Sequence, residues 1–377
     1  MPTDSHTRTW TRARTWRTLA RSSGAAIALL TLTFVGSDIA EACGGFFRSK
    51  TLSPEQQPSL SREKVLLIHD AEAGQQHFIR EVAFQRASEP FGFVVPTPTR
   101  PTVAAVETTP FSKLRAAFPF NPPSRGRGGS KGAGFGGAPG GGVQILEVKK
   151  VGSFTAFVLS ATDSGALAQW LADNDLIATE EADAWLEHYV RMGFFYVAMR
   201  YDPPSADLAD GSAPGPAAVV AETMRISFAT PIPYYPYLEP EAPAGSTLGP
   251  DPRLMELWYV GRDPVVPVAL QTTGDAGGAG RWVRPLETGE QRASARAGVE
   301  AALDPELRKL LPEGPLVLQT FQDQKRSRAG FQDILFASKE GRELSAEQRA
   351  ALEPLLGILD PALRPKPAAG EQAEVGQ

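Results

Sequence analysis

Apolar and polar residues alternate in several short stretches of the chain, as they do in β-strands that bury one face. In residues 76–84 the side chains of Phe78, Val82 and Phe84 fall on one face, and residues 224–228 alternate in the same way. This period of two predicts a half-buried strand in each stretch.

Other strands are predicted from short apolar runs that are bounded by turn residues. The connection "AEAG" joins residues 64–70 to residues 76–84 and is short enough for a β-hairpin. Residues 194–201 are apolar on both faces, which predicts a central strand. Residues 254–261 and 264–272 predict a further strand pair. Additional strands are predicted at residues 91–96, 143–151, 154–160 and 315–321.

Two amphipathic helices are predicted in succession between residues 163 and 192. Asp163 or Ser164 can cap the first helix and Thr179 the second, and Gly193 is suited to end the second. The second helix has the apolar spacing i, i+3, i+4, i+7, i+8. Its stripe consists of Ala182, Trp185, Leu186, Tyr189 and Val190.

Three more helices are predicted from local signals. A short one has Pro110 in its first turn, one lies around residues 292–311, and one begins at Ser345, where Ser345 and Gln348 match a capping box. Together the elements predict an α+β fold: a mainly antiparallel β-sheet assembly with a packed helix pair and a smaller mixed C-terminal portion.

Breaks in these patterns divide the chain. Residues 1–42 are predicted to be a signal peptide, and residues 43–253 a main domain that contains a flexible glycine-rich loop at 122–142. Residues 254–360 form the mixed C-terminal portion, which is either a separate domain or part of the main one. Residues 361–377 are expected to be a disordered tail.

The chain start has the features of an export signal. Residues 1–23 carry five arginines against one acidic residue, and residues 24–35 form an apolar run that is too short to span a bilayer. Ala40 and Ala42 supply the small residues that signal peptidase needs, so cleavage is predicted after Ala42 with Cys43 as the new N-terminus. The mature protein is therefore expected in the periplasm or outside the cell.

Cys43 is the only cysteine, so no internal disulfide can form and stability must come from the apolar core. A lipid anchor on Cys43 is an alternative, but Glu41 and other polar residues interrupt the apolar run that lipoprotein processing needs. An intermolecular disulfide and metal chelation by the thiol and terminal amine also remain open. The favoured interpretation is that Cys43 packs beside Phe46 and Phe47.

Composition narrows the class of partner. Hydrophobic residues make up 42% of the chain, which supports a large core, and the net charge is −5. Without residues 1–42 the charge is about −7, because five arginines and three acidic residues are removed. Such a protein has no electrostatic basis for nucleic-acid binding. No second apolar run reaches membrane-spanning length.

One group of residues suggests a metal site. If the hairpin turn is centred near Ala73, His69 and His77 lie opposite each other and could share a metal ion, with Asp70 and Glu72 nearby. A third ligand is missing, since Asp70 points to the opposite face from His69. The favoured interpretation is therefore two solvent-facing histidines, and no metal, cofactor or catalytic residue is assigned.

The proline-rich stretch "PIPYYPYLEP" suggests a binding surface. Tyr234, Tyr235 and Tyr237 could stack on a sugar or a peptide. The favoured alternative is that they cap the end of a sandwich with their hydroxyl groups in water.

Several segments, taken together, resemble a known family. They are "ACGGFF", "FGFVVPTPTRP", "LSATDSGALAQWLADNDL", "LEHYVRMGFFYVAMR" and "MRISFATPIPYYP", in this order from about Ala42 to Pro236. They resemble the bacterial exported proteins of domain of unknown function family 2330. The resemblance implies an exported protein of mixed strands and helices and carries no catalytic residues. Family members commonly have Gly-Tyr where this chain has Asp175 and Leu176, and many have more cysteines or a C-terminal membrane segment.

Two functions from different classes remain. The first is a non-catalytic extracytoplasmic binding or structural module, whose partner is an unknown protein or glycan. The second is an extracytoplasmic hydrolase or metal-binding protein whose site is assembled from distant residues. The sequence contains no recognisable nucleophile or metal motif, which favours the first and argues against an enzyme.

Overall fold

The computed structural model describes twelve parts of the chain, with gaps between them. They are residues 45–49, 58–87, 90–120, 143–174, 176–177, 180–202, 219–240, 253–271, 281–325, 328, 330–339 and 344–355. The predicted signal peptide, its cleavage residues Ala40 and Ala42, Cys43, the glycine-rich loop and the C-terminal tail lie outside the described residues, as does the predicted cap Thr179.

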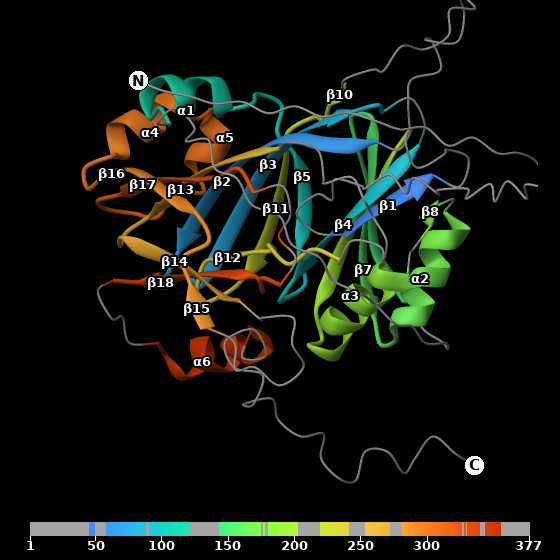
Figure 1. Ribbon diagram of the computed structural model, residues 1–377. Helices are drawn as coiled ribbons and strands as arrows, with labels where there is room; N and C mark the ends of the chain where they lie inside the picture. Colours follow the sequence, from blue (N-terminus) through green and yellow to red (C-terminus); the bar gives the residue numbers. More distant parts are fainter. Residues whose placement is uncertain are drawn as a thin grey trace, which may run out of the picture. The chain divides into compact units, whose positions relative to one another are not determined.

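The strands among the described residues form three sheets (Figure 1). The first has the order β6 (Val143–Val151), β7 (Phe154–Ala161), β9 (Phe195–Tyr201), β4 (Phe91–Thr97), β1 (Gly45–Ser49) and β8 (Leu176–Ile177). The second has the order β16 (Glu287–Arg292), β17 (Val317–Asp323), β13 (Leu254–Gly261), β2 (Ser59–Asp70), β3 (Gln75–Gln85), β11 (Met224–Ala229) and β5 (Thr102–Ala105), and β10 (Val219–Val220) also pairs with β3. The third has the order β12 (Tyr234–Tyr235), β18 (Ile334–Ser338), β14 (Val265–Gln271) and β15 (Arg281–Val283).

Strand pairing is antiparallel throughout these sheets except between β13 and β2, which run parallel. The predicted α+β class with mainly antiparallel sheets is confirmed. The helices are α1 (Phe111–Ala117), α2 (Ser164–Asp173), α3 (Glu180–Arg191), α4 (Arg296–Ala302), α5 (Pro305–Arg308) and α6 (Ala346–Leu352), followed by a 3-10 turn at Glu353–Leu355.

The second sheet is buried on both faces, because alternate residues of its central strands are apolar in both phases. Val65 and Leu67 of β2 belong to the large core shared with the other two sheets. Leu66 and Ile68 point the other way, into a smaller core with Trp258. Helices α1, α4 and α5 cover this smaller core and lie together at one end of the view in Figure 1.

The first and third sheets both pack on the large-core face of the second. Phe84 of β3 contacts Phe91 of β4, with ring centroids 4.6 Å apart. Tyr259 of β13 stacks on Phe336 of β18 at 6.1 Å. A single apolar core, with no disulfide among the described residues, therefore joins all three sheets.

The helix pair forms as predicted. The Asp163 side chain accepts a hydrogen bond from the backbone amide of Gly165 and so caps α2. In α3 the apolar stripe is buried from Ala182 to Tyr189. Gly193 follows α3 with a φ of 69°, a left-handed conformation that suits glycine at a helix end. The capping box of Ser345 and Gln348 is also present.

Two predictions are wrong. The strands β13 and β14 do not pair with each other; β13 lies between β2 and β17, and β14 lies between β18 and β15. The single helix expected around residues 292–311 is two short helices. The side chain of Asp304 caps α5 and Pro305 occupies its first turn, where proline cannot continue the preceding helix.

Residues 254–338 share sheets with the earlier part of the chain. Strand β13 pairs with β2 over seven residues, and β12 pairs with β18. In the described part of the chain, no helix is both long and apolar enough to cross a membrane.

Candidate functional site

The two histidines of the predicted metal site do not face each other. In the β2–β3 hairpin His77 pairs with Ile68, and His69 pairs with Gln76. The centre of the turn lies between Glu72 and Ala73, half a residue before the predicted centre at Ala73. The cross-strand partner of each residue is therefore displaced by one position. A shift of one residue moves a side chain to the other face of a sheet, so His69 and His77 lie on opposite faces. This register gives no basis for the shared metal site that was considered as an alternative. The favoured interpretation of two solvent-facing histidines is wrong for His69, which is 2% exposed.

Each histidine instead has its own partner. The Nε2 atom of His69 lies 3.0 Å from the carbonyl oxygen of Thr230, and the Nδ1 atom of His77 lies 2.8 Å from the hydroxyl of Ser227. Burial, followed by the charge of Arg225, lowers the pKa of His77 to about 4. His77 is therefore neutral at physiological pH.

The acidic residues of the same turn are also engaged. Asp70 accepts hydrogen bonds from the backbone amides of Glu72 and Ala73, at 2.9 Å and 3.2 Å. Glu72 forms an ion pair with Arg262. Across the described residues, no three histidine, cysteine, aspartate or glutamate side chains are grouped as metal ligands.

Residues 230–240, here called the tyrosine strap, run through the interior and include β12 of the third sheet. Tyr234, Tyr235 and Tyr237 are each 0% exposed. The prediction that these tyrosines lie at the surface, either on a ligand or in water, is wrong. Their rings pack in the large core and their hydroxyl groups bond to buried carboxylates.

Side chains from distant parts of the chain satisfy the backbone of the strap. The amide group of Gln76 donates to the carbonyl of Tyr234 at 2.7 Å and accepts from the amide of Tyr234 at 2.8 Å. The indole of Trp185 in α3 donates to the carbonyl of Leu238 at 2.9 Å. These bonds replace the regular sheet pairing that the prolines of the strap interrupt.

Asp333, which immediately precedes β18, accepts hydrogen bonds from several groups of the strap. Its carboxylate receives the hydroxyl groups of Tyr189 at 2.8 Å and Tyr234 at 2.7 Å. It also receives the backbone amides of Tyr237 at 2.7 Å and Leu238 at 2.8 Å. One carboxylate therefore connects α3, the strap and the third sheet.

Burial raises the pKa of Asp333 to about 6, although the four hydrogen bonds oppose this shift. Burial and the neighbouring Asp333 charge also raise the pKa of Tyr189 and of Tyr234 well above its ordinary value. Both tyrosines therefore keep their protons and serve as donors.

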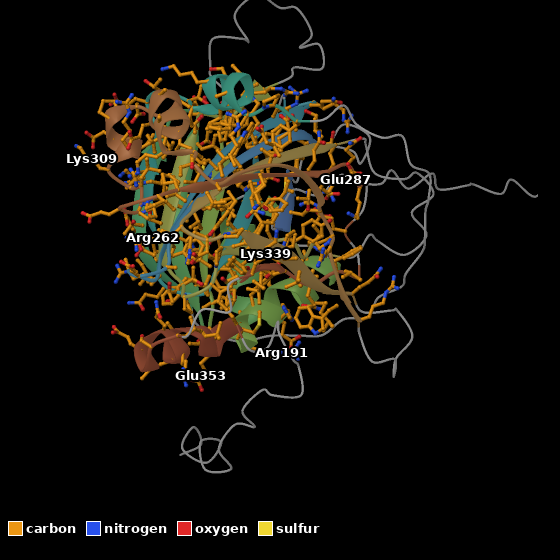
Figure 2. The ribbon with its side chains drawn as sticks, turned by 90° about the vertical axis from the view of Figure 1, so that its left-hand side faces the viewer. Arg191, Arg262, Glu287, Lys309, Lys339 and Glu353 are labelled. Carbon is orange, nitrogen blue, oxygen red and sulfur yellow. The ribbon has the colours of Figure 1, made fainter. Side chains whose placement is uncertain are left out.

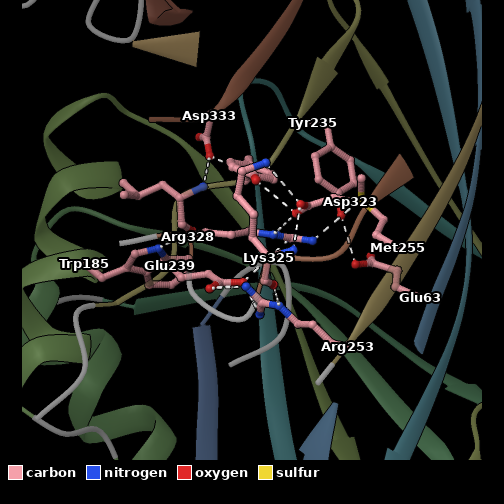
Figure 3. A network of polar contacts seen from close by, with 12 residues as sticks. Glu63, Trp185, Tyr235, Glu239, Arg253, Met255, Asp323, Lys325, Arg328 and Asp333 are labelled. Atoms are coloured by element: carbon pink, nitrogen blue, oxygen red, sulfur yellow. Dashed lines mark hydrogen bonds and ion pairs between the residues drawn. The ribbon is translucent and has the colours of Figure 1, made fainter. Parts of the chain in front are cut away.

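A second group of charges lies beside the strap (Figure 3). Arg253 and Glu239 form a bidentate pair with N–O distances of 2.5 Å and 2.8 Å. The guanidinium of Arg328 lies 3.6 Å from Glu239 and donates to Asp323 at 3.0 Å. The hydroxyl of Tyr237 donates to the same oxygen of Asp323 at 3.0 Å.

The pKa values of the two carboxylates in this group shift in opposite directions. Burial raises the pKa of Glu239, against the opposing charges of Arg253 and Arg328. Burial also acts to raise the pKa of Asp323, but the charges of Arg328 and Lys325 outweigh it and leave that pKa below its ordinary value.

Glu63 of β2 forms a third buried pair. Its carboxylate lies 2.7 Å from Nε of Arg80 in β3, with both side chains 1% exposed. It also accepts the hydroxyl of Tyr235 at 2.9 Å. The guanidinium of Arg80 lies 4.9 Å from the ring centroid of Phe93 in β4, which brings the first sheet into contact with this pair.

We call these groups the buried ionic network; it consists of Glu63, Arg80, Glu239, Arg253, Asp323, Arg328 and Asp333. All seven residues are at most 5% exposed. Each of the four carboxylates is bound by arginine, tyrosine or backbone groups of the same chain. Other charged side chains, such as Lys309 and Glu353, lie on the outside of the molecule (Figure 2). The network thus pairs each carboxylate with a donor or a cation of the same chain and fixes the position of the strap.

Sequence reasoning missed the network, although one signal was present. Glu63 lies in phase with Val65 and Leu67 on the buried face of β2, and Asp323 lies in phase with Phe321 on β17. A charge at an apolar position of a strand indicates a buried partner. The sequence does not reveal which arginine or tyrosine supplies that partner.

We expect the substitution Asp333→Asn to remove a pH dependence of stability. The folded pKa of about 6 exceeds the ordinary value of 3.8. The carboxyl therefore contributes a stability that is complete below pH 4 and is lost as the pH rises through 6. The shift corresponds to about 2–3 kcal/mol. The free energy of unfolding, measured in urea, should change less between pH 4 and pH 8 for the variant than for the wild type. An equal pH dependence in both proteins would contradict the assignment.

Removing one partner of the Glu239–Arg253 pair should cost more than removing both. Arg253→Met leaves a buried carboxylate with only the more distant Arg328, so we expect a loss of about 3–5 kcal/mol in unfolding free energy. The double variant Glu239→Leu/Arg253→Met removes the uncompensated charge and should be more stable than the single variant. Denaturant unfolding of both variants measures this order, and the reverse order would argue against a desolvated pair.

Comparisons with known proteins agree with the resemblance seen in the sequence. A family model described as "Uncharacterized protein conserved in bacteria (DUF2330)" matches residues 38–236. No curated protein matches the sequence. The crystal structure of baculovirus P35 matches 74% of this chain and 97% of its own chain, at 8% sequence identity and a TM-score of 0.33. A TM-score this low says nothing about the function of this chain. Because the family match spans more than half of the residues, this chain belongs to the DUF2330 family of bacterial proteins.

Proposed function

We propose that this protein is a non-catalytic binding or structural module that works outside the cytoplasm. The buried ionic network carries the proposal. Its carboxylates are buried, and they bind arginines, tyrosines and backbone amides of their own chain. A substrate would have to displace these internal bonds to reach them. The network therefore supports a rigid body more readily than a catalytic centre.

The proposal of export rests on the sequence. Residues 1–42 have the arginine-rich start, the apolar run and the small residues at Ala40 and Ala42 that signal peptidase requires. The apolar core that joins three sheets supports a body that needs no disulfides in an oxidising compartment. Its partner would be an extracytoplasmic protein or glycan.

An extracytoplasmic hydrolase is the second candidate. Asp333 favours it, because a carboxyl with a pKa of about 6 is suited to general acid–base catalysis. However, Asp333 is 0% exposed and four donors of its own chain surround it. This enclosure makes the structural role the better-supported one.

Export predicts a defined N-terminus. When the whole chain is expressed in a bacterial host, we expect the extracytoplasmic fraction to contain a protein whose intact mass begins at Cys43 without acyl chains. The variant Ala42→Arg should retain residues 1–42, because signal peptidase does not accept a large charged residue at this position. A full-length protein in the cytosol, or an acylated one in membranes, would contradict the proposal.

A screen of purified protein tests the absence of catalysis. We expect no turnover of ester, phosphate, glycoside or peptide substrates above the background of an Asp333→Asn preparation made in the same way. The variant is a matched control because it removes the carboxyl with the raised pKa and keeps a side chain of similar size. Turnover that the variant lacks, while both proteins are folded at the pH of the assay, would establish the hydrolase instead.

A further inference from the structure

The outer strand β6 of the first sheet presents apolar side chains to solvent. Among the strands that the structure describes, β6 pairs with β7 alone. Ile145 is 49% exposed and Val148 is 56% exposed, which are high fractions for large apolar residues. An outer strand also leaves a row of backbone amides and carbonyls without ladder partners.

This edge differs from the other sheet edges in length. Strand β6 has nine residues, whereas β8 has two, β5 has four and β15 has three. Strand β16 has six residues, contains no large apolar residue and, like β6, has a register shift. Short edges are poor templates for a new strand. The edge of β6 is long, and its sequence "VQILEVKKV" contains no proline.

We propose that β6 is a self-association strand, through which two copies of the chain pair in an antiparallel manner. A twofold axis perpendicular to the joined sheet passes through one residue, and that residue lies opposite its own copy. The charges of β6 decide which residue this is. An axis through Glu147 would place two carboxylates opposite each other, and an axis through Lys149 would place two ammonium groups opposite each other.

An axis through Val148 avoids both conflicts. It places Glu147 of each copy opposite Lys149 of the other, so the opposite charges meet twice. It also places the exposed Val148 opposite itself, which removes apolar surface from water. Leu146 then faces Lys150, a pair without charge conflict. A second copy fits this edge because the strand carries both members of its own charge pairs.

The resulting contact is a continuous sheet that spans two molecules. The register between β6 and β7 shifts between Ile145 and Glu147, so β6 is regular from Glu147 onward. The proposed axis at Val148 lies within this regular part. A contact of this length is small, and we expect micromolar affinity. Self-association goes beyond the proposed function and does not depend on export.

The test is a charge exchange measured by sedimentation equilibrium of the purified whole chain, with a reductant present so that Cys43 cannot link two copies. We expect a concentration-dependent dimer for the wild type. Lys149→Glu puts like charges opposite each other twice and should weaken dimerisation roughly tenfold or more. The double variant Glu147→Lys/Lys149→Glu restores opposite charges and should regain the wild-type affinity.

Lys150→Glu is the matched control, because it makes the same charge change one residue away, opposite Leu146. Its dimerisation should stay within about twofold of the wild type. Unfolding midpoints equal to the wild type confirm that each variant is folded. A wild type that stays monomeric, a double variant that does not regain affinity, or a control as weak as Lys149→Glu would overturn the proposal.

Discussion

A carboxylate in a protein interior must be hydrogen-bonded or paired, and this requirement at Asp333 organises much of the structure. Its two oxygens accept the hydroxyl groups of Tyr189 and Tyr234 and two backbone amides of the strap. These donors come from α3 and from the strap, while Asp333 itself immediately precedes β18. The apolar core brings these parts together, but only the hydrogen bonds define one position for each of them.

The same network joins the two parts of the chain that the family match separates. The match ends at Pro236, whereas Asp323 and Asp333 lie well beyond it. Tyr189 and Tyr234 lie inside the matched range and use Asp333 as their acceptor. Strand β13 also lies outside the range and yet pairs with β2. The matched residues therefore depend on later residues for their buried polar groups and for part of their sheet.

The proposed function rests on where the polar groups lie. The buried carboxylates of the network are enclosed and bound to donors of the same chain, so they contribute rigidity. The outward features are of a different kind: a long outer strand with exposed apolar residues, one acidic residue and two lysines. A rigid body that presents a strand edge is typical of proteins that act by association.

The sequence by itself determined the elements whose signals are local. Asp163 and Ser345 cap helices with bonds to residues two and three positions away, and the spacing of the α3 stripe defines its buried face. Only the tertiary structure decided the hairpin register that separates His69 from His77, because a shift of one residue is invisible to periodicity. It also decided the burial of the tyrosine strap, since the acceptors for its hydroxyl groups lie up to 172 residues away along the chain. Local rules cannot indicate a hydrogen bond whose partners meet only after the sheets have packed.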